Sequence, residues 1–110
     1  MSDEGGSGAE PQAGHSTPPE AVVRVLKIVN KKGLHARASA KFVQTVERFD
    51  AQVRVTRGNE TVGGTSIMGL MMLSAGPGTS ITVSATGPEA EAALDAITEL
   101  VASKFNEEGV

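Results

Sequence analysis

The chain contains no cysteine, tryptophan or tyrosine among its 110 residues. The absence of cysteine excludes a disulfide scaffold and a thiolate metal site, so an apolar core must hold the fold. No apolar run approaches the ~18 to 20 residues that a membrane-spanning helix needs, and the N-terminal residues lack the apolar stretch of a secretory signal. We therefore expect a cytoplasmic protein that does not insert into membranes.

Aromatic residues are limited to three phenylalanines, and the formal net charge is -3 at pH 7. A nucleic-acid-binding domain would normally present a basic face or aromatic platforms on which bases stack. Both features disfavour nucleic acid as a partner, and with it a small αβ RNA-binding domain. The acidic chain nevertheless gathers Lys31, Lys32, Arg37 and Lys41 in one segment. This basic cluster indicates an acidic partner surface.

The N-terminal segment differs in composition from the rest of the chain. Residues 1–20 are rich in glycine, serine, proline, alanine and glutamate, and they show no apolar periodicity. This composition predicts a disordered tail. His15 lies in that tail without a neighbouring cation, so it is not expected to carry chemistry. Residues 21–110 are predicted to form one domain.

Apolar periodicity predicts the element order β-α-β-β-α-β-α in this domain. Strands are predicted at residues 22–29, 51–56, 60–62 and 80–86, and helices at 36–49, 67–73 and 88–105. The strands expose polar residues on one face, and the two longer helices have a single apolar stripe. These patterns predict an α+β fold in which three helices pack on one face of a four-stranded antiparallel sheet.

His35 stands between the first predicted strand and the first predicted helix, in the segment Gly33-Leu34-His35-Ala36-Arg37. A side chain at a helix N-terminus lies among unpaired backbone N–H groups at the positive end of the helix dipole, which suits a phosphate. A neutral imidazole is a good nucleophile, and Arg37 adds a planar set of donors that matches phosphate oxygens. The alternative is a surface histidine beside an ordinary basic residue, because short motif matches also arise by chance.

Ser66 precedes a second short helix that is unusually apolar, Ile67-Met68-Gly69-Leu70-Met71-Met72-Leu73. The serine is in the place of an N-cap and could also be a phosphorylation site. So many apolar side chains exceed the one stripe that a packed helix buries. The surplus, with Ile67, Met68 and Met71, predicts a docking patch, in which methionine adapts to different partners. The alternative is a small helix buried in the core.

These two motifs, at this spacing, resemble those of the histidine-containing phosphocarrier (HPr) family of the bacterial phosphotransferase system, over roughly Val22 to Phe105. The resemblance implies an open-faced β-sandwich. It implies that Nδ1 of His35 accepts a phosphoryl group from enzyme I and passes it to enzyme IIA-type proteins. Arg37 and the amides after the histidine would stabilise the transferred charge. Ala36 would contact partners, and Ser66 would be phosphorylated by an HPr serine kinase/phosphorylase.

The resemblance also bears on cofactors and assembly. No cofactor is expected, and any metal is expected to belong to the partners, because one histidine in the folded region cannot form a site by itself. A small carrier that uses one face for all its partners is expected to be a monomer. A role in sugar uptake and a nitrogen-related regulatory role both fit.

The chain departs from the family pattern at several positions. Ala38 stands where many members have proline, Gly69 stands where many have lysine, and Gln44 and Glu47 reduce the basic face. These departures bear on the partner set rather than on the phosphoryl chemistry. The remaining alternative is a regulatory binding module that is controlled through Ser66 and carries no phosphate on His35.

Overall fold

The computed structural model describes residues 21–107, so the predicted N-terminal tail lies outside the described residues. The elements in chain order are β2 (Val22–Lys27), α1 (Ala36–Val46), β3 (Gln52–Arg57), β4 (Glu60–Gly63), α2 (Ile67–Met72), β5 (Ser80–Thr86), α3 (Ala90–Ala102) and a short turn, η2 (Lys104–Asn106). This order confirms the predicted one and adds η2, which was not predicted.

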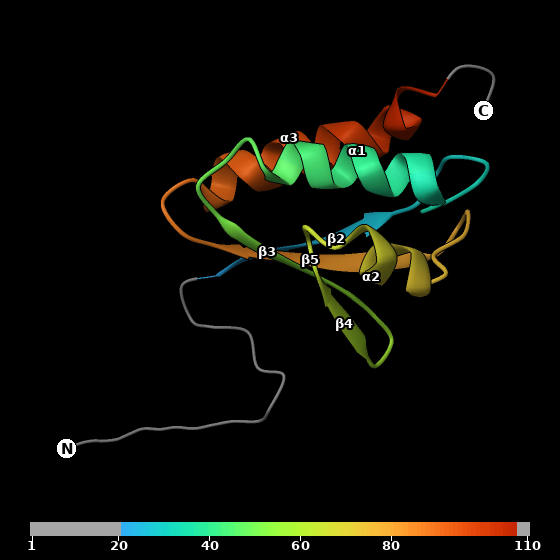
Figure 1. Ribbon diagram of the computed structural model, residues 1–110, viewed down its shortest axis with the longest axis horizontal. Coiled ribbons are helices and arrows are strands. Elements are labelled where there is room, and N and C mark those ends of the chain that lie inside the picture. The colour runs from blue at the N-terminus through green and yellow to red at the C-terminus, as the bar shows by residue number, and fades with distance from the viewer. Residues whose placement is uncertain (1–20, 108–110) are drawn as a thin grey trace.

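The four strands form one antiparallel sheet in the order β2-β5-β3-β4. Figure 1 shows α1 and α3 side by side across one face of this sheet, and α2 packs against α1 and β4. The predicted α+β architecture, with three helices on one face of a four-stranded sheet, is therefore confirmed.

The core lies between the sheet and the helices. It follows the predicted periodicities, because β5 alternates between buried and half-buried residues and α1 buries one stripe. Phe42 of α1, Val83 of β5 and Ile97 of α3 have no exposed surface. The first helix ends at Val46, before the predicted end at residue 49, because its last turn tightens to bonds between residues three apart, such as the one from Phe49 N to Val46 O of 3.1 Å.

The loop before α1 is fixed against the loop that follows α2. Leu34 N donates to Ala75 O at 3.0 Å, and Gly33 adopts a φ of +64°. A Cβ added to Gly33 would lie 2.2 Å from Ala75 O, so no other residue fits this corner without a backbone shift. Gly33 therefore makes a tight corner, which sets where α1 begins.

The end of the last helix differs from the prediction. The pattern predicted a helix as far as residue 105, but α3 ends at Ala102. Lys104, Phe105 and Asn106 then follow with φ values of 58°, 58° and 57°, which makes η2 a left-handed turn. Phe105 is fully buried although it lies beyond the helix. The apolar periodicity did not indicate the change from a right-handed helix to a left-handed turn.

Candidate functional site

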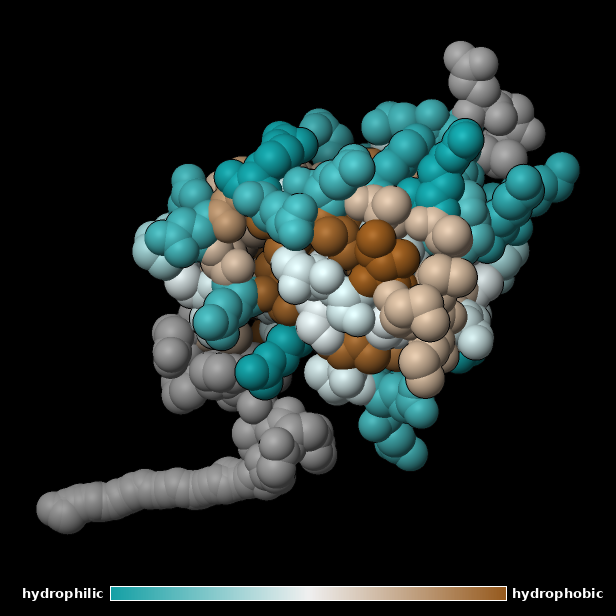
Figure 2. Space-filling view, in the orientation of Figure 1, coloured by the Kyte–Doolittle hydropathy of each residue, from teal (hydrophilic) through white to brown (hydrophobic). Residues whose placement is uncertain are grey.

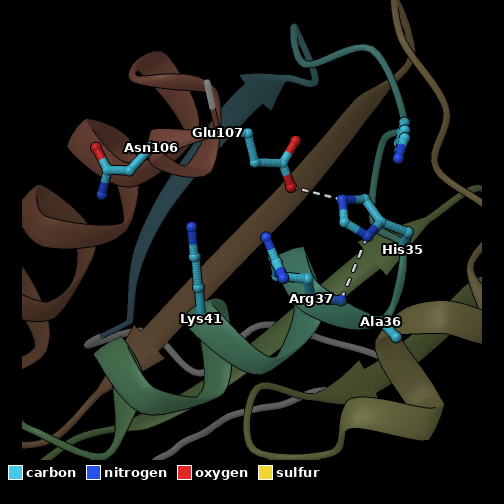
Figure 3. Close-up of a pocket in the computed structure, with 7 residues that line it drawn as sticks. His35, Ala36, Arg37, Lys41, Asn106 and Glu107 are labelled. Carbon is cyan, nitrogen blue, oxygen red and sulfur yellow. Dashed lines mark hydrogen bonds and ion pairs between the residues drawn. The ribbon is translucent and has the colours of Figure 1, made fainter. Parts of the chain in front are cut away.

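His35 is the N-cap of α1, as the sequence predicted. Its backbone is extended, with φ -76° and ψ -177°, and its Nδ1 accepts a hydrogen bond from the backbone N–H of Arg37 at 3.3 Å (Figure 3). The His35 side chain is 27% exposed. The ring therefore lies at the positive end of an 11-residue helix, within reach of solvent or of a partner.

The other ring nitrogen of His35 faces a carboxylate that sequence reasoning missed. Nε2 of His35 lies 2.5 Å from Oε2 of Glu107, whose side chain is only 8% exposed (Figure 3). Asn30, which is fully buried, donates from Nδ2 to Oε1 of Glu107 at 3.3 Å. No local pattern indicated that Glu107 returns to the histidine.

The Glu107 carboxylate is ionised through most of the pH range. Its partial burial would by itself raise the pKa, but the hydrogen bonds from His35 and Asn30 and the charges of His35 and Lys41 outweigh that effect. The net result is a Glu107 pKa below its ordinary value. A fixed negative charge therefore lies against Nε2 of His35, while Nδ1 faces the helix N-terminus.

Basic residues line an open pocket together with His35. The pocket is lined by Lys32, His35, Ala36, Arg37, Lys41, Asn106 and Glu107 (Figure 3). Three of the four residues of the predicted basic cluster therefore lie together here, whereas Lys31 does not line the pocket. Lys41 also donates from Nζ to the carbonyl oxygen of Phe105 at 2.6 Å. The pocket can attract an anionic group to Nδ1 of His35.

The second predicted motif is at the start of α2. Ser66 is the N-cap of this helix, and its exposed Oγ accepts a hydrogen bond from Gly69 N at 3.0 Å. The helix buries Leu70 but exposes four other apolar side chains, which we call the α2 patch: Ile67, Met68, Met71 and Met72. Met68 and Met72 are each 69% exposed. Figure 2 shows these apolar side chains gathered on the face where α2 lies. The expectation that α2 exposes surplus apolar residues is confirmed, and Met72 joins those named from the sequence.

The two motifs lie on one surface of the molecule. Helices α1 and α2 pack against each other, and Figure 3 shows exposed Ala36 beside the ribbon of α2. A shallow hollow is lined by His35 together with residues 74–76, which follow α2. One partner can therefore cover His35 and the α2 patch at the same time.

Two other kinds of site are absent from residues 21–107. No helix in this range is long and apolar enough to cross a membrane. Within the same range, no group of three or more histidine, cysteine, aspartate or glutamate residues is arranged to hold a metal ion.

Comparison with known proteins identifies the family. The model PTS-HPr, which describes the phosphorylation site of the HPr component of the phosphotransferase system, matches residues 22–103. The chain belongs to the HPr family of phosphocarrier proteins. The family predicted from the two sequence motifs is therefore confirmed.

Relatives in the HPr family resemble most of the described chain. Phosphocarrier protein HPr of Cupriavidus necator is 48% identical over 80 residues, which cover 73% of this chain and 90% of the relative. Phosphocarrier protein NPr of Shewanella violacea is 44% identical over 84 residues, covering 76% and 92% respectively. The crystal structure of HPr-C-His from Thermoanaerobacter tengcongensis has a TM-score of 0.76 and 42% identity, and the match covers 79% of this chain and 98% of that one.

Proposed function

We propose that this HPr-family chain carries a phosphoryl group on His35, which it receives from phosphorylated enzyme I and passes to enzyme IIA-type proteins. The observation that carries the proposal is the position of His35 at the N-terminus of α1. There Nδ1 lies next to the Arg37 amide, and the ring is partly exposed. Helix N-termini bind phosphate well, because their free N–H groups and dipole both favour an anion.

Neighbouring residues have distinct roles in this proposal. The Arg37 guanidinium is exposed and lines the pocket, where it can stabilise the charge of the transferred group. Ala36 is exposed and small, so a partner can approach the ring closely. The α2 patch supplies the apolar area that a partner buries on docking.

We also propose that Ser66 is a regulatory site, modified by an HPr serine kinase/phosphorylase. Its hydroxyl is exposed and adjoins Ile67 and Met68 of the α2 patch. A phosphate at this helix N-terminus would be tolerated by the fold, but it would place nearly two negative charges beside a surface that partners must desolvate. Modification would therefore weaken docking rather than unfold the helix.

The proposal extends to the setting in which the protein works. Residues 21–110 would form the phosphocarrier domain, which folds without residues 1–20 and acts in the cytoplasm as a monomer. A monomer leaves the surface that contains His35 and the α2 patch free for each partner in turn.

Incubation with enzyme I and phosphoenolpyruvate tests the proposal directly. Wild-type protein is expected to gain one acid-labile phosphate, and His35→Ala is expected to gain none while remaining folded. His15→Ala is the matched control, because the chain contains only 2 histidines. Phosphorylation of the His35→Ala variant would refute the assignment of His35.

The same experiment addresses the second candidate function, a binding module regulated only through Ser66. The exposed serine beside an exposed apolar patch favours this alternative. It predicts that enzyme I transfers no phosphate, and that a serine kinase introduces an acid-stable phosphate that is lost in Ser66→Ala.

A further inference from the structure

The two nitrogens of the His35 ring have partners that fix where its proton lies. The backbone N–H of Arg37 can only donate, so Nδ1 must offer its lone pair to it. In the neutral ring the proton is then on Nε2, which donates to Oε2 of Glu107 at 2.5 Å. The structure therefore selects the tautomer in which Nδ1 is the nucleophilic nitrogen.

Glu107 is itself fixed in position by a buried residue. Nδ2 of Asn30 donates both to Oε1 of Glu107 at 3.3 Å and to the carbonyl oxygen of Gly33 at 2.9 Å. Gly33 lies two residues before the histidine, so the carboxylate and the loop that leads to His35 share one hydrogen-bond donor. Asn30 thereby sets the distance between Glu107 and the ring.

The backbone before Glu107 adopts an unusual conformation. Residues 104–106 are all left-handed, which is unfavourable for residues with side chains. Such conformations persist where surrounding contacts determine them, and they often lie beside functional sites. Here buried Phe105 anchors the turn, and the bond from Lys41 Nζ to its carbonyl oxygen ties the turn to α1. The turn ends with Glu107 against the ring.

We propose that Glu107 is a positioning residue for phosphoryl transfer at His35, an inference that rests on the proposed function. Its carboxylate keeps the proton on Nε2 and orients the ring so that Nδ1 faces the incoming phosphorus. It also stabilises the positive charge that the ring acquires in the transfer.

The transfer step balances without any movement of a proton. The Nδ1 lone pair gives up its hydrogen bond from the backbone N–H of Arg37 and forms the new N–P bond. The N–P bond of the phosphohistidine on the donor breaks, and its electron pair returns to the donor nitrogen. The phosphorylated ring keeps the proton on Nε2 and becomes cationic. The Glu107 carboxylate, which lies 2.5 Å from Nε2 in the unphosphorylated protein, is its counter-ion. Passing the group to an acceptor reverses these changes.

Three variants test this role. Glu107→Ala removes the acceptor and the charge, Glu107→Gln keeps an acceptor without the charge, and Glu99→Gln is the control because Glu99 is an exposed carboxylate on α3 that does not line the His35 pocket. Thermal denaturation shows that each variant is folded. Nitrogen-15 NMR of the labelled His35 ring, without any donor, measures the tautomer, and single-turnover transfer from saturating phosphorylated enzyme I measures the rate.

Wild type and Glu99→Gln are expected to show the Nε2–H tautomer and equal rates. Glu107→Ala is expected to show a mixture of tautomers and transfer slower by about tenfold, because orientation and counter-charge are both lost. Glu107→Gln is expected to keep the tautomer and to show an intermediate rate.

An unchanged tautomer in a folded Glu107→Ala variant would overturn the proposal, whatever its transfer rate, because the carboxylate would then not set the ring. An unchanged rate in that variant would overturn it as well. Failure of wild type to accept phosphate would refute the proposed function instead. The tautomer measurement uses no donor, so it separates these two failures.

Discussion

Two substitutions at Ser66 are expected to separate its effect on stability from its effect on docking. Ser66→Ala should lower the stability, and Ser66→Asp should weaken docking. The Oγ atom caps α2 through the bond from Gly69 N of 3.0 Å. Ser66→Ala removes this bond and should lower the free energy of unfolding by about 1 kcal/mol, which lowers the melting temperature of a domain of this size by about 4–8 °C. Ser66→Asp keeps a capping acceptor and adds a negative charge at the positive end of the helix. Its melting temperature should therefore stay close to that of wild type.

The affinity for enzyme I should fall in Ser66→Asp and stay unchanged in Ser66→Ala. Ser66→Ala leaves the α2 patch uncharged, so its affinity should equal that of wild type. Ser66→Asp places a charge beside Ile67 and Met68, which should cost about 1 kcal/mol or more of binding free energy, or roughly fivefold or more in Kd. Phosphoserine carries more charge than aspartate and should weaken binding further.

Calorimetric titration of enzyme I, together with thermal denaturation of each variant, measures both effects. Ala92→Asp is the control, because it adds one negative charge at an exposed position on α3. Its affinity should match that of wild type. Equal affinities for unmodified, Ser66→Asp and phosphorylated protein would refute the regulatory role and leave Ser66 as a helix cap only.

Three further predictions concern the surroundings of His35. Gly33→Ala should lose about 2–4 kcal/mol of unfolding free energy in a urea titration, because a Cβ at φ +64° would lie 2.2 Å from Ala75 O; wild-type stability would contradict this. Arg37→Ala should keep the melting temperature but slow phosphoryl transfer on the order of 10- to 100-fold, and an unchanged rate would make the guanidinium incidental. The lowered pKa of Glu107 stabilises the folded state above the ordinary value of 4.5, and this contribution disappears as the pH falls through the folded-state pKa. The stability advantage of wild type over Glu107→Gln should therefore shrink in acid, and denaturation curves that keep it constant would contradict the ion pair.

Much of the fold and part of the site could be predicted from local sequence patterns. The strand Ser80–Thr86 alternates visibly, and the caps at His35 and Ser66 each depend on residues within three positions of the cap. Burial produces the alternation, because a periodic apolar face must be covered, and local hydrogen bonds produce the caps. The surplus apolar residues of α2 indicated its exposed patch for the same reason.

Glu107 could not be predicted in this way. It lies 72 residues from its partner His35, and a left-handed turn at residues 104–106 brings the two together. Apolar periodicity assumes a right-handed helix, so it extended the last helix to residue 105, through the turn. The three-dimensional packing determines which distant polar residues meet. Such contacts therefore produce no periodic pattern in the sequence.

Phosphorus-31 NMR of the phosphorylated protein, with nitrogen-15 in its histidine rings, tests the central claim most directly. The account predicts a single phosphorus signal that couples to Nδ1 of His35 and disappears in His35→Ala. A phosphorus bonded to Nε2, a phosphate on another residue, or no phosphorylation by enzyme I would contradict it.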